Sequence, residues 1–312
     1  MSARDSAAGW LASMPECAHA CAKERVMDLY ADVLEPAGRM VWLGSLLQLV
    51  TPFGINERAL RTAVFRLVGQ GWLSSLRSGR RSAYAVAPAA LEAAAAARAL
   101  AAPLRPAAWT GGWTLVMAWC ARLHPGDAGP LHALLTACGY RLIQPGVYGR
   151  PGGDPDALAR RCAALGLQDQ VALFQDAGPA AITPQALNAR VAQLWELEPL
   201  AERYRTLATT AAHVRRLLSH QAPDAEQAYV IMVLLRGWLR RIRRDDPLLP
   251  AGALPPDWAG AQAETSVGAL LAQLDSQARR HVAGVLEHPQ RDHAERPGRA
   301  IAAAWPGADP VA

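Results

Sequence analysis

Arginine side chains are concentrated in one short stretch of this 312-residue chain. Between Asn56 and Ser82 there are six arginines and a single acid, Glu57, which leaves a local charge of +5. That value equals the net charge of the whole chain. Guanidinium groups bind phosphates and the edges of guanine bases through paired hydrogen bonds. The stretch is therefore a candidate for binding nucleic acid.

The spacing of these arginines indicates a helix with two different faces. Asn56 is a typical N-terminal cap for this helix, and Gly71 is a typical end. Apolar residues that recur at the helical spacing share one face: Leu60, Ala63, Val64 and Leu67. The arginines spread over the opposite side, from which they can enter a major groove. Phe65 also falls on the polar side, and we expect it to pack under the hairpin that follows.

The elements around this helix predict how it is held. We expect helices over 23–34 and 41–50, then the arginine-bearing helix, a strand over 72–76, a basic turn over 77–82 and a return strand over 83–87. This is the order of a winged helix-turn-helix domain. The residues predicted to contact DNA are Asn56, Arg58, Arg61, Thr62, Arg66, Arg80, Arg81 and Tyr84. An arginine stripe alone also fits a solvated surface, or a hairpin that binds another protein. The topology, the cap and the basic turn together favour double-stranded DNA.

The remaining sequence predicts an α+β chain with further domains. A flexible tail is expected over 1–22, the winged-helix domain over 23–88, and an alanine-rich helix or linker over 89–108. Strand, helix, strand, strand, helix and strand follow within 109–182, which is the order of a ferredoxin-like domain. We expect a helical C-terminal domain over 183–287. The charged, proline-bearing tail 288–312 is expected to be disordered.

The sequence motifs of several classes of enzyme are missing from this chain. The only lysine is Lys23, so no Gly-Lys-Ser/Thr phosphate-binding loop exists. No G-x-S-x-G, H-E-x-x-H or G-x-G-x-x-G motif is present. Cys17, His19 and Cys21 are of zinc-binding types, but no second ligand pair with finger spacing follows them. We therefore expect no metal, no cofactor and no enzyme activity.

A ferredoxin-like enzyme that processes nucleic acid is the alternative reading. Small CRISPR-associated nucleases, which the middle domain resembles, place a metal-binding Asp at the end of their first strand. Here that strand ends in Trp119-Cys120-Ala121-Arg122, and no carboxylate follows before Asp127. An arginine where a metal ligand is needed argues against hydrolysis.

The sequence also predicts no association with a membrane. The first residues lack a basic region followed by an apolar core, so we expect no signal peptide. The longest apolar stretch, 106–121, contains two glycines and is shorter than the ~20 residues of a spanning helix. A cytoplasmic protein is expected.

One block of motifs resembles the PaaX-type transcriptional repressors of phenylacetate catabolism. The motifs that carry the resemblance are Val41-Trp42-Leu43-Gly44-Ser45-Leu46, Phe53-Gly54-Ile55-Asn56-Glu57-Arg58, Arg61-Thr62-Ala63-Val64-Phe65-Arg66-Leu67, Gly71-Trp72-Leu73 and Gly79-Arg80-Arg81-Ser82-Ala83-Tyr84. Weaker similarity extends over about residues 25–275, including Leu194-Trp195-Glu196-Leu197 and Asp246-Pro247-Leu248-Leu249-Pro250. The resemblance implies a dimeric regulator whose inducer, phenylacetyl-coenzyme A, releases it from its DNA operator.

The inducer site is predicted from residue types that suit a coenzyme A thioester. Arginines and aromatic rings suit its phosphates and adenine. The candidates are Trp195, Trp238, Arg240, Arg241, Arg243 and Arg244. The alternative is that these arginines are a solvated helix end, where cations are favoured by the helix dipole. Gly237-Trp238-Leu239 departs from the family motif, which has a histidine and an aromatic residue there, so a different acyl-coenzyme A, or none, is also open.

The size of a DNA site predicts the oligomeric state of the protein. One recognition helix reads only a few base pairs, whereas two that are related by a two-fold axis read an inverted repeat. We expect a homodimer held mainly by residues beyond about 105.

Overall fold

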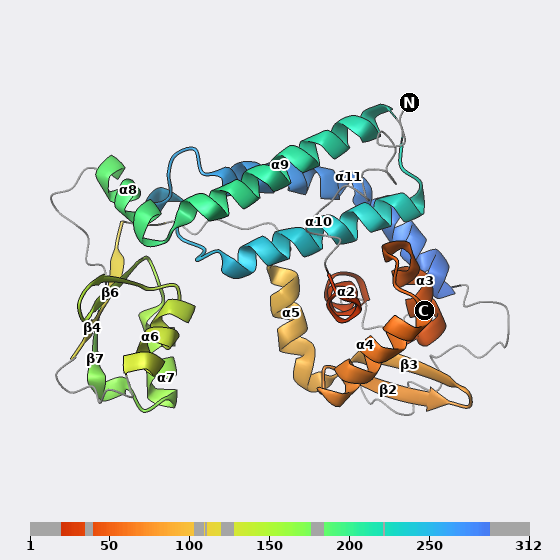
Figure 1. Cartoon of the computed structure of the whole chain (residues 1–312), viewed down its shortest axis with the longest axis horizontal. Coiled ribbons are helices and arrows are strands. Elements are labelled where there is room, and N and C mark those ends of the chain that lie inside the picture. The colour runs from red at the N-terminus through yellow and green to blue at the C-terminus, as the bar shows by residue number, and fades with distance from the viewer. Residues whose placement is uncertain are drawn as a thin grey trace. The chain divides into compact units, whose positions relative to one another are not determined.

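The computed structural model describes residues 20–34, 40–102, 109, 111–119, 128–175, 184–220 and 222–287. The chain packs into two compact units, and Figure 1 shows their elements. Unit 1 comprises residues 1–103, 207–241 and 265–312, and unit 2 comprises residues 104–206 and 242–264. Helices and antiparallel sheets are both present, in agreement with the predicted α+β class. The predicted tail 288–312, and 1–22 apart from its last three residues, lie outside the described residues.

Unit 1 begins with helices and a small sheet. Its elements are α2 (Ala22–Leu29), the π-helical turn η2 (Tyr30–Leu34), β1 (Val41–Trp42), α3 (Leu43–Val50), the 3₁₀ turn η4 (Thr51–Phe53), α4 (Glu57–Gly69), β2 (Leu73–Ser78), β3 (Arg81–Val86), the 3₁₀ turn η5 (Pro88–Ala90) and α5 (Leu91–Ala99). The strands pair antiparallel in the order β1-β3-β2. This order of elements places α4 directly before the β2–β3 hairpin.

Local sequence accounts for the turns on either side of α4. Gly54 ends η4 in the left-handed region at φ 75°, a conformation that costs glycine no steric strain. Gly79 takes φ 57° at the tip of the hairpin for the same reason. Behind α4, the buried side chains of α2, α3 and α4 form the core, and Tyr30 donates a hydrogen bond from its hydroxyl to the carbonyl of Tyr84 at 2.8 Å.

Two predicted elements of unit 1 need correction, and the helical alternative for the alanine-rich stretch is confirmed. Residues 41–42 are not the start of a helix but a strand, paired with Tyr84 and Ala83 of β3. The predicted basic turn 77–82 is mostly strand, because Arg77 pairs with Ser82 and Ser78 with Arg81, so that only two residues turn. The alanine-rich stretch within 89–108 forms η5 and α5, whose Ala90 and Ala94 are buried.

Later segments of the chain complete unit 1. They come from α9 (Leu197–His220), α10 (Ala225–Asp245) and α11 (Ala259–Glu287), each of which contributes residues to both units. The Tyr229 hydroxyl of α10 donates to the carbonyl of Leu49 at 2.8 Å, and its ring stacks on His281 of α11 at 4.9 Å. The N-terminal elements therefore share their core with helices more than a hundred residues later.

Unit 2 is built on a four-stranded sheet. Its first elements are β4 (Trp113–Ala118), α6 (Ala128–Ala137), β5 (Arg141–Gln144), β6 (Val147–Pro151), α7 (Pro155–Ala164), the 3₁₀ turn η7 (Gln168–Gln170) and β7 (Val171–Phe174). All neighbouring strands are antiparallel, in the order β5-β6-β4-β7. Leu131 and Leu135 of α6 and Leu158 of α7 pack with Val116 and Tyr148 of the sheet, so the two helices cover one face.

The remaining elements of unit 2 are α8 (Pro184–Leu194), the start of α9, the end of α10 and the 3₁₀ turn η8 (Ala251–Ala253). The Asn188 amide donates to the carbonyl of Leu254 at 3.1 Å, and the ring of Tyr204 packs edge-on against Trp258.

Within the described residues, no helix is both long enough and apolar enough to cross a bilayer.

Candidate nucleic-acid interface

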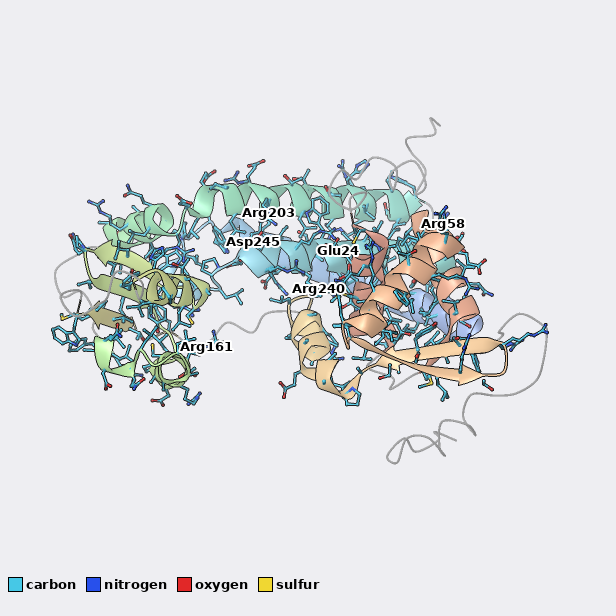
Figure 2. The ribbon with its side chains drawn as sticks, turned by 60° about the horizontal axis from the view of Figure 1, so that its bottom comes forward. Glu24, Arg58, Arg161, Arg203, Arg240 and Asp245 are labelled. Atoms are coloured by element: carbon cyan, nitrogen blue, oxygen red, sulfur yellow. The ribbon has the colours of Figure 1, made fainter. Side chains whose placement is uncertain are left out.

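Helix α4 presents one buried and one exposed face, as its sequence predicts. Asn56 caps it by accepting a 2.9 Å hydrogen bond from the amide of Ala59. The apolar residues Leu60, Ala63, Val64 and Leu67 are all buried. The predicted contact residues Arg58, Arg61, Thr62 and Arg66 are all exposed. Figure 2 labels Arg58 among the side chains of this helix. The buried face fixes the helix so that the arginines face solvent.

Two of the exposed side chains already have partners within the helix. Arg61 donates from both Nε and Nη2 to Glu57 Oε1, at 2.8 and 2.6 Å. Both side chains are more than half exposed, so the pair is worth only ~0.3–0.5 kcal/mol and gives way to a phosphate or base at small cost. The Thr62 hydroxyl donates to the carbonyl of Arg58, which leaves its oxygen to accept from a ligand.

The β2–β3 hairpin adds cations beside α4. Arg77 and Arg80 are exposed, whereas Arg81 is half-buried at the start of β3. Tyr84 is also half-buried, in the centre of the sheet, where it pairs with Ser75 and Val41. Helix and hairpin together therefore supply every predicted DNA-contacting residue from two adjacent elements.

A hollow of about 480 Å³ lies between these two elements. Its lining residues are Arg61, Thr62, Phe65, Val68, Ser75 and Tyr84. The prediction that Phe65 packs under the hairpin is wrong, because 79% of this residue is exposed. Nothing in the sequence indicated that Ser75 and Val68 line this hollow. For Phe65 the only indication was that an aromatic residue falls on the polar side of the predicted helix. An exposed ring among arginines is suited to apolar contact with a thymine methyl group.

The exposed arginines of the site can bind an anion. Among the described residues, no group of three or more His, Cys, Asp and Glu side chains lies close enough to hold a metal ion. Cys17, His19 and Cys120 lie outside the described residues.

The predicted inducer-binding residues belong partly to unit 1 and partly to unit 2. Arg240 belongs to unit 1, where it is 2% exposed and forms ion pairs with Asp28 and Asp32. Its Nε also donates to the carbonyl of Ala97 at 2.7 Å. Burial raises the pKa of the Asp32 carboxyl, and the neighbouring Arg240 guanidinium opposes that rise. Arg240 thus joins α10 to α2 and α5, and it is not part of a solvated helix end.

The other candidates divide between the units. Trp238 and Arg241 belong to unit 1, and the Trp238 ring is buried. Trp195 belongs to unit 2, where its indole donates to the carbonyl of Gly139 at 2.9 Å. Arg243 is buried in unit 2 and pairs with Glu264 at 2.9 Å. Arg244 is exposed and lines a cavity of unit 2.

Comparison with known proteins places these observations in context. Residues 22–90 match a family model described as PaaX-like protein, and residues 195–284 match one described as PaaX-like protein C-terminal domain. The chain is 32% identical over 237 residues to the transcriptional repressor PaaX of Escherichia coli (strain K12). This aligned region covers 75% of this chain and 74% of that protein. A solved structure, the uncharacterized protein Rv0674 from Mycobacterium tuberculosis, shares the fold with a TM-score of 0.56 and 23% identity, over 84% of this chain and 98% of that one.

Proposed function

Because this chain belongs to the PaaX-like family, we propose that it is a transcriptional repressor that binds double-stranded DNA through α4 and the β2–β3 hairpin. The relative in E. coli is named a transcriptional repressor, and the family is one of regulators and not of enzymes. The observation that carries the proposal is the division of α4 into a buried apolar face and an exposed face with three arginines. A helix of this kind, held by its core beside a basic hairpin, can enter a major groove.

We interpret the two units as known architectures. In unit 1, the order α2, α3, α4 and hairpin fits a winged helix, with α4 as recognition helix and β2–β3 as wing. In unit 2, the order β-α-β-β-α-β and the antiparallel sheet β5-β6-β4-β7 fit a ferredoxin-like domain. Arginines of α4 would read base edges, and the wing would contact the flanking backbone.

The regulated genes and the inducer are proposed from the resemblance to the family. The repressor would act in the cytoplasm on an operon for catabolism of phenylacetate-type aromatic acids. An acyl-coenzyme A such as phenylacetyl-coenzyme A would release it from its operator. If phenylacetyl-coenzyme A is the inducer, it lowers the affinity of the protein for DNA by some factor. Bound DNA must then lower the affinity of the protein for the thioester by the same factor. Titrations of each ligand in the presence of the other test this equality.

A homodimer would match an operator with two half-sites. Large apolar side chains at the sheet of unit 2 support it: Met117 is 37% exposed, Trp119 47% and Phe174 47%. Met117 and Phe174 alternate with the core residues of their strands, so they lie on the face opposite to α6 and α7. Exposed apolar groups that gather in this way are typical of an interface.

The DNA-binding proposal is tested by selection of duplexes from a random library with the full-length chain. The selected duplex is then titrated by fluorescence anisotropy at several salt concentrations. The proposal expects enrichment of an inverted repeat and an affinity that falls steeply with salt, because each neutralised phosphate releases counterions. A library without enrichment, or an affinity that is independent of salt, would contradict it.

A further inference from the structure

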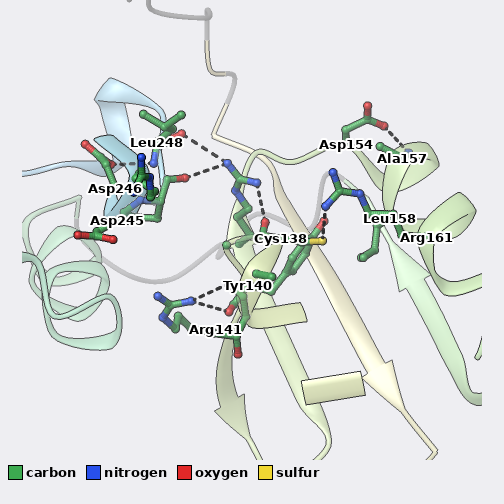
Figure 3. Close-up of a pocket in the computed structure, with 16 residues that line it drawn as sticks. Cys138, Tyr140, Arg141, Asp154, Ala157, Leu158, Arg161, Asp245, Asp246 and Leu248 are labelled. Carbon is green, nitrogen blue, oxygen red and sulfur yellow. Dashed lines mark hydrogen bonds between the residues drawn. The ribbon is translucent and has the colours of Figure 1, made fainter. Parts of the chain in front are cut away.

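Unit 2 contains a cavity of about 430 Å³ whose walls carry four arginines. They are Arg141 and Arg150 of the sheet, Arg161 of α7 and Arg244 near the end of α10. In Figure 3, Asp154 and Arg161 lie on one side of the cavity, and Asp245, Asp246 and Leu248 lie on the other. All of these residues belong to unit 2.

Three of the four arginines, Arg141, Arg150 and Arg161, donate hydrogen bonds to neutral acceptors. Arg150 donates to the carbonyl oxygens of Cys138, at 2.8 Å, and Pro247, at 3.1 Å, and its buried Nε has no hydrogen-bond partner among the described residues. Arg141 donates to the carbonyl of Tyr140 at 3.0 Å. Arg161 donates to the Cys138 sulfur at 3.3 Å. Burial lowers the pKa of both Arg141 and Arg150, and the nearby Glu196 opposes this change at Arg141.

The three acids in the lining neutralise these cations only in part. Asp154 accepts from the amide of Ala157 at 2.8 Å and so caps α7. Asp245 pairs with Arg203, outside the cavity lining, at 2.7 Å. Asp246 accepts a 2.6 Å hydrogen bond from the Tyr204 hydroxyl. Asp245 is neutralised by Arg203, and the four arginines outnumber the two remaining carboxylates, so the lining keeps an excess of positive charge that favours an anion.

A second cavity of about 550 Å³ adjoins the first. Arg150, Asp246 and Leu248 line both cavities. The second cavity is lined mostly by apolar and aromatic groups, among them Trp109 and Trp258. An apolar cavity that adjoins an arginine-lined one suits a ligand with a charged head and an apolar tail.

We propose that unit 2 binds a phosphate-bearing small molecule, with its phosphates among Arg141, Arg150, Arg161 and Arg244 and its apolar part toward Trp109 and Trp258. Guanidinium groups match phosphate geometry through two parallel hydrogen bonds, and a concave site of this size admits a metabolite but not a duplex. The site stands on its own geometry. That its ligand is the inducer rests on the proposed function.

The test is calorimetric titration of the full-length chain with inorganic pyrophosphate, coenzyme A, phenylacetyl-coenzyme A and free phenylacetate. Arg161→Gln and Arg244→Gln remove exposed cations from the cavity without touching the hydrogen bonds of Arg150. Arg160→Gln is the matched control, because Arg160 is exposed on the same helix but does not line the cavity. Charge-assisted hydrogen bonds predict a loss in affinity of about tenfold or more for each cavity variant and none for the control.

A second readout uses the Cys138 thiol, which is half-buried at Arg161. Bound phenylacetyl-coenzyme A, which has no free thiol to consume the reagent, should slow alkylation of Cys138 by iodoacetamide, as mapped by mass spectrometry. The exposed Cys21 serves as the internal control.

Three results would overturn the inference: no binding of any of the three phosphate probes, equal losses for Arg160→Gln and Arg161→Gln, or phenylacetate binding as tightly as its thioester. Cavity variants that weaken DNA binding but leave the coenzyme A titration unchanged would instead assign the arginines to the DNA backbone. A chain that binds coenzyme A but no DNA would refute the proposed repressor and leave this site intact.

Discussion

Replacement of Arg240 by Met should destabilise unit 1 severely. The guanidinium is 2% exposed and lies between two acids whose side chains are 13% and 1% exposed, Asp28 and Asp32. Its removal takes from the buried Asp32 its ion-pair partner, whereas Asp28 keeps Arg25 at 3.9 Å. A buried charge that loses its partner typically costs ~3–5 kcal/mol. A folded domain is stable by only ~5–15 kcal/mol, so this one change removes a large share. Urea denaturation followed by circular dichroism measures the loss.

The same change has a predicted pH dependence. Burial already raises the pKa of Asp32 in the folded chain, and Arg240 opposes the rise, so the variant raises this pKa further. A carboxyl whose pKa is higher in the folded chain than in the unfolded chain stabilises the fold while it is protonated. This stability is fully present below the unfolded pKa of ~3.9 and is lost as the pH rises through the folded pKa. The loss in Arg240→Met should therefore be largest at pH 7 and shrink toward pH 4.5.

Arg279→Met is the matched control, because Arg279 forms an exposed pair with Asp275 on α11. A helical surface pair of this kind contributes only ~0.3–0.5 kcal/mol. If Arg240→Met costs less than ~1 kcal/mol at pH 7, or costs the same at pH 4.5, then the buried triad does not hold α2 against α10 as described.

Three further changes separate the core, the hairpin and the assembly. Leu67→Ala should destabilise unit 1 by ~2–5 kcal/mol in urea denaturation, because Leu67 is fully buried; a loss in DNA affinity without a loss in stability would contradict its place in the core. Arg80→Ala should weaken all duplexes evenly and reduce the salt slope by about one, measured by anisotropy; a loss confined to one sequence would argue against a backbone contact. Met117→Glu combined with Phe174→Glu should give a monomer in light scattering. Leu165→Glu is the control and should leave the dimer intact, because Leu165 is an apolar residue 55% exposed elsewhere in unit 2. A dimer that survives the double change would place the interface elsewhere.

Elements with a clear local pattern were predictable from the sequence. Helix α4 combines an asparagine cap with apolar residues at the helical period, and both signals lie within the helix itself. The strand β1 was missed because residues 41–50 are a continuous apolar run, which periodicity cannot divide between helix and strand. Its pairing with Ala83 and Tyr84, forty residues later, decides the matter.

The role of Arg240 was hidden for a similar reason. Four arginines at the end of a helix resemble a solvated surface, and charged residues are almost never fully buried unless they are paired. The acidic partners of Arg240 lie more than 200 residues earlier, on α2 and η2, so no local pattern joins them. The arginines of the unit 2 cavity likewise come from the sheet, α7 and α10, and only the tertiary fold brings them together.

The proposed DNA-binding role of α4 is tested most directly by Arg61→Ala against Arg279→Ala in the full-length chain. Each change removes an exposed arginine from an i,i+4 ion pair in unit 1, so the loss within the helix is matched. Fluorescence anisotropy with the selected duplex and with a scrambled one, at one fixed moderate salt concentration, gives the affinities of each chain for both. Arg61→Ala should lose ~1–3 kcal/mol of discrimination between the selected duplex and a scrambled one, whereas Arg279→Ala should lose none. Equal affinities for the two variants and the unaltered chain would contradict the assignment of α4 as the helix that reads DNA.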